Sequence, residues 1–317
     1  MVADEQIRKS KSIQRRTGKT FHVATRLLPE RIRHATYVLY AFFRIADEVV
    51  DDPGASAPAE QRERLLEIRR AALGETDTDD PVLAAFSELR QRHDIDDEDV
   101  NVFIDAMLAD IETRRYETYE ELETYMDGSA AAVGRMMTAV MDPNDREIAL
   151  SHATALGEAF QMTNFLRDVR EDVVERDRIY IPQSTLQSHD VDESEIERLE
   201  MSPEFAAAMR SELHRTEGLY QKGVAGIKYL PKDCQLAVLL ASVLYVDHHR
   251  LIRAREYDVL SSTPQLGLGR KLYLLAKTRW RWAWNNDPET VFREVSTIGD
   301  PEPHRHGAGP IERLPTR

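Results

Sequence analysis

The stretch from Leu156 to Pro182, LGEAFQMTNFLRDVREDVVERDRIYIP, limits what this chain can fold into more than any other. At about 100° per residue, its polar side chains gather within an arc of roughly 80° on one side of a helix; they are Gly157, Gln161, Asn164, Asp168 and Asp172. The rest of the circumference is mostly apolar, so this polar stripe is expected to face an internal cavity. Two carboxylates one turn apart repel each other, and burying them is costly unless a cation lies between them.

A second stretch, YVLYAFFRIADEVVDD from Tyr37 to Asp52, has the same pattern. Its polar residues fall within about 60° on a helical wheel; they are Tyr40, Arg44, Asp47 and Asp51. A single D-x-x-x-D is usually a solvated acidic face, but two such pairs on apolar helices favour a functional site. If the helices face each other, the carboxylates form a cage suited to Mg²⁺, or to Mn²⁺ in its place. Because Mg²⁺ fills its shell with substrate phosphate oxygens, the implied ligand is a diphosphate.

Basic side chains are expected to complete the site, because Mg²⁺ neutralises only part of the charge of a diphosphate. The candidates are Lys19, Arg44, Arg167, Arg170, Arg176 and Arg178. Arg44 is favoured because it lies on the polar stripe, whereas Arg178 is either part of a loop that closes over the site or an ordinary loop arginine. Glu48 and Glu171 turn away from the two stripes and are expected near the surface or behind the site.

The chain has 317 residues and no linker, and helices are expected almost throughout, with no alternating strand. Residues 1–16 are expected to form an N-terminal helix, 17–284 one catalytic domain, and 285–317 a C-terminal tail that is partly disordered. The expected helices are Asp4 to Arg15, Arg31 to Val50, Ala59 to Leu73, Asp80 to Arg92, Asp97 to Thr113, Tyr119 to Met141 with a break near Gly128, Arg146 to Val174, Pro203 to Tyr229, Lys232 to Asp258 and Gly267 to Trp284.

Composition excludes several classes of protein. The net charge of −14 argues against a nucleic-acid partner. The single cysteine, Cys234, excludes a disulfide framework and fits a reducing cytoplasm. No apolar run reaches the roughly 18 residues of a membrane-spanning helix, and the N-terminus is too polar for a signal peptide. Excess carboxylate with only 8 Lys beside 34 Arg favours a salt-rich cytoplasm over an ordinary acidic protein.

Three segments carry a resemblance to a known family. They are TFHVATRLLPERIRHATYVLYAFFRIADEVVDD, YMDGSAAAVG and the stretch from Leu156 to Pro182. Together they resemble the squalene and phytoene synthase family of head-to-head prenyl transferases over about Thr17 to Lys271, and within it most closely the prokaryotic, haloarchaeal phytoene synthases. The resemblance implies an all-α, single-domain isoprenoid-synthase fold, with helices around a central cavity whose mouth carries the two aspartate pairs.

The resemblance also implies roles for individual residues. The catalytic and Mg²⁺-binding carboxylates match Asp47, Asp51, Asp168 and Asp172. The diphosphate-binding positions match Lys19, Arg44, Arg167, Gln161 and Asn164. The aromatic positions beside the reacting carbons match Tyr40, Tyr125 and Tyr245, and Phe21 opens the motif that lines the pocket. Thr20 stands where a serine is usual, and Asp177 where a glycine is common; the second departure weakens the case for Arg178.

The residues allow the chemistry that the resemblance implies. Mg²⁺ can stabilise a departing diphosphate, and tyrosine rings in an apolar cavity can stabilise the allylic cation that remains. By resemblance, the cation alkylates a second prenyl diphosphate, closes a cyclopropane, ionises again, rearranges and loses a proton. The expected product is phytoene from two geranylgeranyl diphosphates without NADPH, since no G-x-G-x-x-G fingerprint is present.

Other functions stay open at this point. The nearest alternative is squalene or dehydrosqualene formation from farnesyl diphosphate. A head-to-tail prenyl transferase or terpene cyclase is disfavoured because no D-D-x-x-D motif accompanies the helices, and a non-catalytic relative because both aspartate pairs are intact. Small residues are expected in the segments that line a deep pocket: Ala24, Thr25, Ala130, Ala131 and Ala132. Substrates with long apolar tails also predict a peripheral membrane surface as partner, with an apolar patch near the cavity mouth.

Overall fold

The computed structural model describes residues 24–51 and 57–298, and at Asp51 it describes the backbone only. This part of the chain is helical and contains no strand, only one isolated bridge between Arg115 and Ile179. The all-α prediction is therefore confirmed for the described residues. The expected helix from Asp4 to Arg15 lies outside them.

The helices follow the sequence in a simple order. They are α3 (Glu30–Asp51), α4 (Pro58–Leu73), α5 (Pro81–His93), α6 (Asp97–Ala109), α7 (Tyr119–Met126), the π-helical segment η1 (Asp127–Ala131), α8 (Ala132–Met141), α9 (Arg146–Arg176), α10 (Gln183–Ser188), α11 (Glu193–Glu197), α12 (Pro203–Val224), the 3₁₀ turn η2 (Ile227–Tyr229), α13 (Lys232–Ala254), α14 (Leu268–Trp284) and α15 (Pro288–Val295). The expected break near Gly128 is the π-helical segment η1, which continues the helical path from α7 into α8.

Local sequence signals set many of the helix ends. The side chain of Asp80 accepts a hydrogen bond from the backbone of Val82 at the start of α5, and Ser202 does the same for Phe205 at the start of α12. α8 and α9 each end on an aspartate in the left-handed conformation, Asp142 and Asp177. Asparagine and aspartate tolerate this conformation better than most residues.

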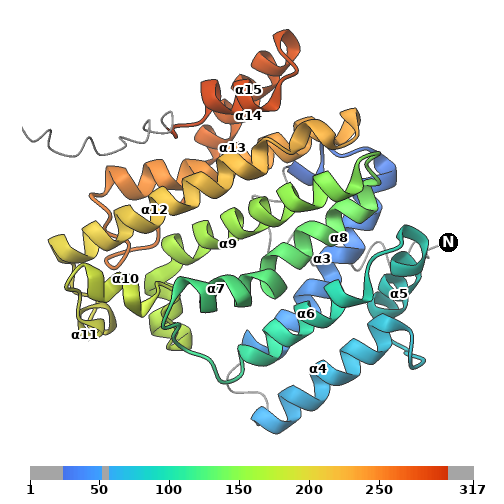
Figure 1. Ribbon diagram of the computed structural model, residues 1–317, viewed down its shortest axis with the longest axis horizontal. Helices are drawn as coiled ribbons and strands as arrows, with labels where there is room; N and C mark the ends of the chain where they lie inside the picture. Colours follow the sequence, from blue (N-terminus) through green and yellow to red (C-terminus); the bar gives the residue numbers. More distant parts are fainter. Residues whose placement is uncertain (1–23, 52–56, 299–317) are drawn as a thin grey trace, which may run out of the picture.

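The long helix α9 runs through the middle of the molecule, with α12 along one side and α7 and α8 along the other (Figure 1). Its neighbours approach very closely where the chain has small residues. A Cβ at Gly157 of α9 would lie 2.5 Å from the carbonyl oxygen of Ala130, and one at Gly134 would lie 2.6 Å from that of Ala153. The small residues of YMDGSAAAVG thus allow backbone-to-backbone packing between η1, α8 and α9.

Two apolar clusters form the core. One lies around α3, α5 and α6, where the rings of Phe42 and Phe86 stack at 3.8 Å. The other joins α12, α13 and α15 and includes Tyr220, Leu240 and Phe292. Because α15 contributes buried side chains, this part of the predicted C-terminal tail belongs to the folded core. Its eight residues are too short a segment for periodicity to identify a helix.

No helix in the described ranges is both long enough and apolar enough to cross a membrane. The small helices α10 and α11 are absent from the sequence-based prediction for the same reason as α15. They follow the RIYIP segment; α10 contacts α12, and α11 contacts α9.

Candidate active site

A cavity of about 580 Å³ opens among α3, α8, α9 and α13. This volume falls in the range of sites that hold small molecules. The residues of α9 that line it differ along the helix. In the first half they are mostly apolar, such as Ala149, Ala153 and Leu156, with His152 as a polar exception, and the charged side chains follow in the second half. The cavity therefore joins an apolar part to a charged part.

The polar stripe of α9 faces this cavity, as predicted. Gln161, Asn164, Asp168 and Asp172 all line it. The side chains of Asp168 and Asp172 are only 19% and 13% exposed. Arginines hold both carboxylates in place.

Arg167 donates from Nε to Oδ1 of Asp168 at 2.7 Å, and its Nη2 donates to the other oxygen. Arg176 donates from Nη1 to Oδ1 of Asp172 at 3.3 Å. Arg167 and Arg176 themselves line the cavity. The charged half of the wall therefore contains alternating acidic and basic groups, an arrangement that suits a polyanion bound together with a cation.

The carboxyl of Asp172 is poorly neutralised by these arginines. Its pKa is raised to about 7, first by burial and then by the charge of Asp168, and the charges of Arg176 and Arg178 offset this rise only in part. A cation placed between Asp168 and Asp172 would relieve both the desolvation and the repulsion. The donor set therefore fits a hard divalent cation such as Mg²⁺.

The polar side of α3 meets the same cavity. Tyr40, Arg44 and Asp47 line it. Arg44 lies 3.7 Å from Asp47 (Nη1 to Oδ2) and donates to Glu48 at 3.3 Å. Asp51 is the last residue of α3, one turn beyond Asp47, and its side chain is not described. The predicted positions Lys19 and Phe21 lie outside the described residues.

Within the described part of the chain, no three His, Cys, Asp or Glu side chains lie close enough to hold a metal ion by themselves. Carboxylates from α3 and α9 nevertheless line one cavity. Mg²⁺ characteristically takes one or two carboxylates and fills its remaining positions with water and substrate phosphate. The arrangement is thus compatible with a cation that binds together with a diphosphate, and the four-aspartate metal site stays a prediction.

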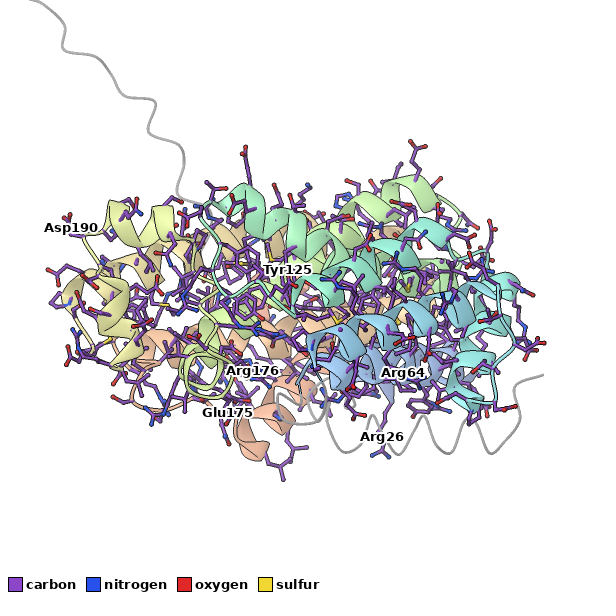
Figure 2. All side chains as sticks on the ribbon, turned by 90° about the horizontal axis from the view of Figure 1, so that it is seen from below. Arg26, Arg64, Tyr125, Glu175, Arg176 and Asp190 are labelled. Carbon is purple, nitrogen blue, oxygen red and sulfur yellow. The ribbon has the colours of Figure 1, made fainter. Side chains whose placement is uncertain are left out.

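An aromatic wall lies beside the charged region. The rings of Phe165 and Tyr180 stack at 3.8 Å, and Tyr125 lies 6.0 Å from Tyr180. Figure 2 shows Tyr125 in the interior of the molecule, in contrast to Asp190 at its edge. Tyr245 packs against Phe160 at 4.6 Å on another part of the wall. Tyr40, Tyr125 and Tyr245 therefore all line the cavity, as the resemblance implies.

Sequence reasoning missed a buried ion pair in the same part of the cavity wall. Asp110, just after α6, accepts a hydrogen bond from the hydroxyl of Tyr125 at 2.9 Å. Arg178 donates to the Asp110 carbonyl oxygen at 2.6 Å, and its Nη1 lies 3.7 Å from the carboxylate. Burial, followed by the charge of Asp110, raises the pKa of Tyr125 well above its usual value, so the phenol stays protonated. The only sequence signal was the arginine of RIYIP, because nothing local marks Asp110.

Several sequence-based expectations need correction. Glu171, expected to face away from the stripe, lines the cavity, because the cavity covers a wider arc of α9 near the end of that helix. Arg170 does not line it and instead donates to the carbonyl oxygen of Leu260 at 2.7 Å. Among the small residues, Ala24, Thr25 and Ala130 line the cavity, whereas Ala131 and Ala132 are packed behind it.

Arg178 is a buried cavity residue and not an ordinary loop arginine. The residue before it, Asp177, has φ 52° and ψ 42° and caps α9. Glycine adopts this left-handed conformation most readily, which is a physical reason for the glycine common at this position in the family. The departure at Asp177 therefore preserves the backbone path and leaves Arg178 in the site.

A helical bundle around one deep cavity, with carboxylates from two helices at its charged end, defines an enzyme of the isoprenoid-synthase fold. The model of the squalene/phytoene synthase family matches residues 14–270, and the chain belongs to this family. This membership makes it an enzyme of the prenyltransferase type.

Individual relatives agree with this assignment. The 15-cis-phytoene synthase of Synechococcus elongatus is 32% identical over 83% of this chain and 88% of its own length. The phytoene synthase of Rhodobacter capsulatus is 28% identical over 88% of this chain and 82% of its own. Among solved structures, a dehydrosqualene synthase superposes with a TM-score of 0.79 at 24% identity and covers 89% of this chain and 98% of its own. A squalene synthase from Alicyclobacillus acidocaldarius gives 0.72 at 23% identity, over 80% of this chain and 95% of its own.

Proposed function

We propose that this protein is a phytoene synthase, which joins two geranylgeranyl diphosphates head to head through a cyclopropyl diphosphate and releases phytoene and diphosphate. The observation that carries the proposal is that carboxylates of α3 and α9 line the charged end of one cavity whose remainder is mostly apolar. Relatives named phytoene synthases, about 30% identical over most of this chain, support the choice of product.

Asp47, Asp51, Asp168 and Asp172 would hold Mg²⁺, which when bound neutralises the diphosphate and helps it to leave. Arg44 and Arg167 would bind the diphosphate oxygens from opposite helices, since both line the cavity beside these carboxylates. Gln161 and Asn164 offer amide donors on the same wall. Their predicted companions Lys19 and Phe21 keep their proposed roles in substrate binding.

The apolar half of the cavity would exclude water from the allylic cation. Tyr125 presents its ring there, and its buried hydroxyl already donates to Asp110, so the ring face is what it offers to the substrate. Tyr40 and Tyr245 line other parts of the cavity and can act in the same way. The final proton is expected to go to the released diphosphate or to a tyrosine oxygen.

The proposal is tested by incubating the purified protein with geranylgeranyl diphosphate and Mg²⁺, without NADPH, and identifying the extracted hydrocarbon. We expect phytoene, loss of product when the metal is chelated, and recovery when Mg²⁺ or Mn²⁺ is added back. A parallel incubation uses farnesyl diphosphate with and without NADPH. Squalene formed only with NADPH, or dehydrosqualene without it, would keep the family and reject the product; no hydrocarbon from either substrate would reject the activity.

We also propose that the enzyme works in the cytoplasm at the surface of a membrane, because its substrates have long apolar tails and its product has no polar group. The excess of 56 acidic over 42 basic residues fits a salt-rich cytoplasm, where ions screen the repulsion between carboxylates. Thermal unfolding at increasing KCl concentration tests the second point, and a melting temperature that falls with salt would contradict it.

A further inference from the structure

The exposed side of α14 is apolar to a degree that no other surface of the described chain matches. Five of the eight large apolar side chains exposed in the described residues lie on this one helix: Leu268, Leu272, Tyr273, Trp280 and Trp284. They recur at steps of three or four residues together with Ala276 and Ala283, so they share one face. Trp284 is 81% exposed, which is unusual for the largest apolar side chain. Contiguous patches of this kind mark interaction surfaces.

The opposite side of α14 is buried against the rest of the fold. Leu274 and Thr278 are buried, and Leu275 and Trp282 pack against the core cluster of α12, α13 and α15. The helix packs on α13 and α15 at one edge of the molecule (Figure 1). The outer face therefore contributes nothing to the packing of the described chain.

The charge of α14 is opposite to that of the protein. Its sequence, LGRKLYLLAKTRWRWAW, contains five basic residues and no acidic one, in a chain of net charge −14. Two of the five are bound at the flanks, Arg270 to Asp247 at 2.7 Å and Arg281 to Glu294 at 3.3 Å. Arg279 lies on the exposed face and forms no ion pair with the described residues. A partner with negative charge and an apolar interior would complement this face.

We propose that α14 docks the protein on an anionic lipid bilayer, with Leu272, Trp280 and Trp284 inserted at the level of the headgroups. Aromatic residues with an apolar body and a polar edge favour that level, and basic side chains beside them attract anionic headgroups. A second copy of the chain fits less well, because a two-fold contact through this face would place α14 against α14 and its basic residues against each other.

The position of α14 connects this surface to the cavity. Arg270 binds Asp247 on α13, two residues beyond Tyr245, which lines the cavity. A bilayer held at α14 would lie next to the helix that forms part of the cavity wall, and long-chain substrates could enter from it. The use of the bilayer as a substrate source rests on the proposed function, whereas the docking itself does not.

The three tryptophans of the chain, Trp280, Trp282 and Trp284, all lie in α14, so tryptophan fluorescence, excited selectively over that of tyrosine, reports on this helix alone. The full-length protein is mixed with vesicles of phosphatidylcholine alone or with phosphatidylglycerol, in the absence of prenyl diphosphate. With the anionic vesicles we expect the emission to shift to shorter wavelength, quenching by iodide to fall, and the protein to float with the lipid. No shift and no flotation of the wild-type protein would overturn the proposal.

Two pairs of variants separate the apolar and the electrostatic contributions. Trp280→Ser with Trp284→Ser should lower vesicle partitioning at least about tenfold and leave the emission of Trp282 unshifted. The matched control is Ile148→Ser, an exposed apolar residue on α9, which should bind like the wild type. Arg279→Glu should weaken binding to anionic vesicles about tenfold, and Arg64→Glu on α4 should not. Equal binding by the double tryptophan variant and the wild type would assign docking to another surface.

Circular dichroism and hydrocarbon formation in detergent solution check that the variants fold. We expect both to match the wild type, so that loss of vesicle binding is separated from loss of activity; an inactive wild-type protein that still binds vesicles would count only against the proposed function. Sedimentation velocity tests the alternative occupant. A wild-type dimer that becomes a monomer in the double tryptophan variant would identify the face as a contact between copies and overturn the proposal.

Discussion

The two aspartate faces share one sequence pattern but lie in different environments. On α9, the side chains of Asp168 and Asp172 are 19% and 13% exposed. On α3, the side chain of Asp47 is 42% exposed. α9 runs through the middle of the molecule, so its polar side can meet only the cavity (Figure 1). The same D-x-x-x-D spacing therefore produces a buried pair of carboxylates on one helix and a more hydrated carboxylate on the other.

The difference in burial predicts that the two aspartate faces differ in their effect on stability, although they share one sequence pattern. Burial, followed by the charge of Asp168, raises the pKa of Asp172 to about 7, so a cation bound at the α9 face would stabilise the folded protein in addition to its proposed role in turnover. Water can solvate Asp47 in the absence of a cation. The two faces are thus expected to respond alike in assays of turnover and differently in assays of folding.

The largest expected effect is on turnover, where the two faces should be equivalent. Asp168→Ala and Asp47→Ala should each lower kcat by about a thousandfold or more, because each removes a carboxylate that would hold the metal, while the fold persists. The measurement is hydrocarbon formation at saturating substrate, beside a thermal unfolding curve. Glu175→Ala, an exposed residue on the same helix that does not line the cavity, is the matched control. Near-normal turnover in Asp168→Ala would reject the site assignment.

The second effect concerns stability without metal and should distinguish the faces. The folded-state pKa of Asp172, about 7, lies above its ordinary value of 3.8. Between these two pH values the folded protein keeps a proton that the unfolded chain has lost, so stability falls as pH rises from about 4 to about 7. Above that window the folded protein carries a constant cost on the order of 4 kcal/mol. Asp172→Asn removes this cost.

Urea unfolding in the presence of a chelator measures this difference. Near pH 8, Asp172→Asn should be more stable than the wild type, and near pH 4 the two should converge. Asp47→Asn is the matched control, because its more exposed carboxylate has little desolvation to lose. Adding Mg²⁺ with inorganic diphosphate should shrink the advantage of Asp172→Asn by stabilising the wild type. Identical dependence of stability on pH for Asp172→Asn and the wild type would contradict the proposed difference between the α9 and α3 carboxylates.

The sequence placed both faces correctly because periodicity is a local property. Asp47, Asp168 and Asp172 could be assigned to a cavity from a helical wheel alone, and all three line it. The helical wheel gave a wrong prediction for Glu171, which lines the cavity, because a wheel does not show how wide an arc of α9 the cavity covers. It also gave no indication of how deeply each helix is buried, so the contrast between Asp47 and Asp172 could not be predicted.

Contacts between distant segments were beyond sequence reasoning. Asp110 and Arg178 are 68 residues apart, and Asp110 stands in a short segment of mixed charge after α6 where nothing distinguishes it from surface carboxylates. Short helices were not predicted for another reason. α15 has only eight residues, and its apolar side becomes evident only from its packing against α12 and α13. Family resemblance supplied the roles of residues, while the physical pattern supplied the faces on which they lie.

A third, smaller effect concerns the aromatic wall between the faces. Tyr125→Phe removes the hydrogen bond from the hydroxyl to the Asp110 carboxylate at 2.9 Å. Because that carboxylate is buried, the variant should lose about 1–3 kcal/mol of stability, measured by urea unfolding. The aromatic face remains, so turnover should fall less than about tenfold, whereas Tyr125→Leu should lose more. Equal turnover in the phenylalanine and leucine variants would mean that the ring face does not stabilise the substrate cation.

The smallest effect is expected at the end of α9, where Asp177 occupies the left-handed position with φ 52°. Glycine fits this conformation without strain, but Asp177→Gly also removes the ion pair with Arg115 at 3.1 Å and increases the freedom of the unfolded chain. Asp177 is 77% exposed in its side chain, so the lost pair contributes little. These opposing contributions should leave stability within about 1 kcal/mol of the wild type, with unchanged turnover. Valine cannot adopt this conformation readily, so Asp177→Val should lose more stability and disturb the position of Arg178. The measurements are urea unfolding and hydrocarbon formation. A valine variant as active and as stable as the glycine variant would show that this backbone position does not control the site.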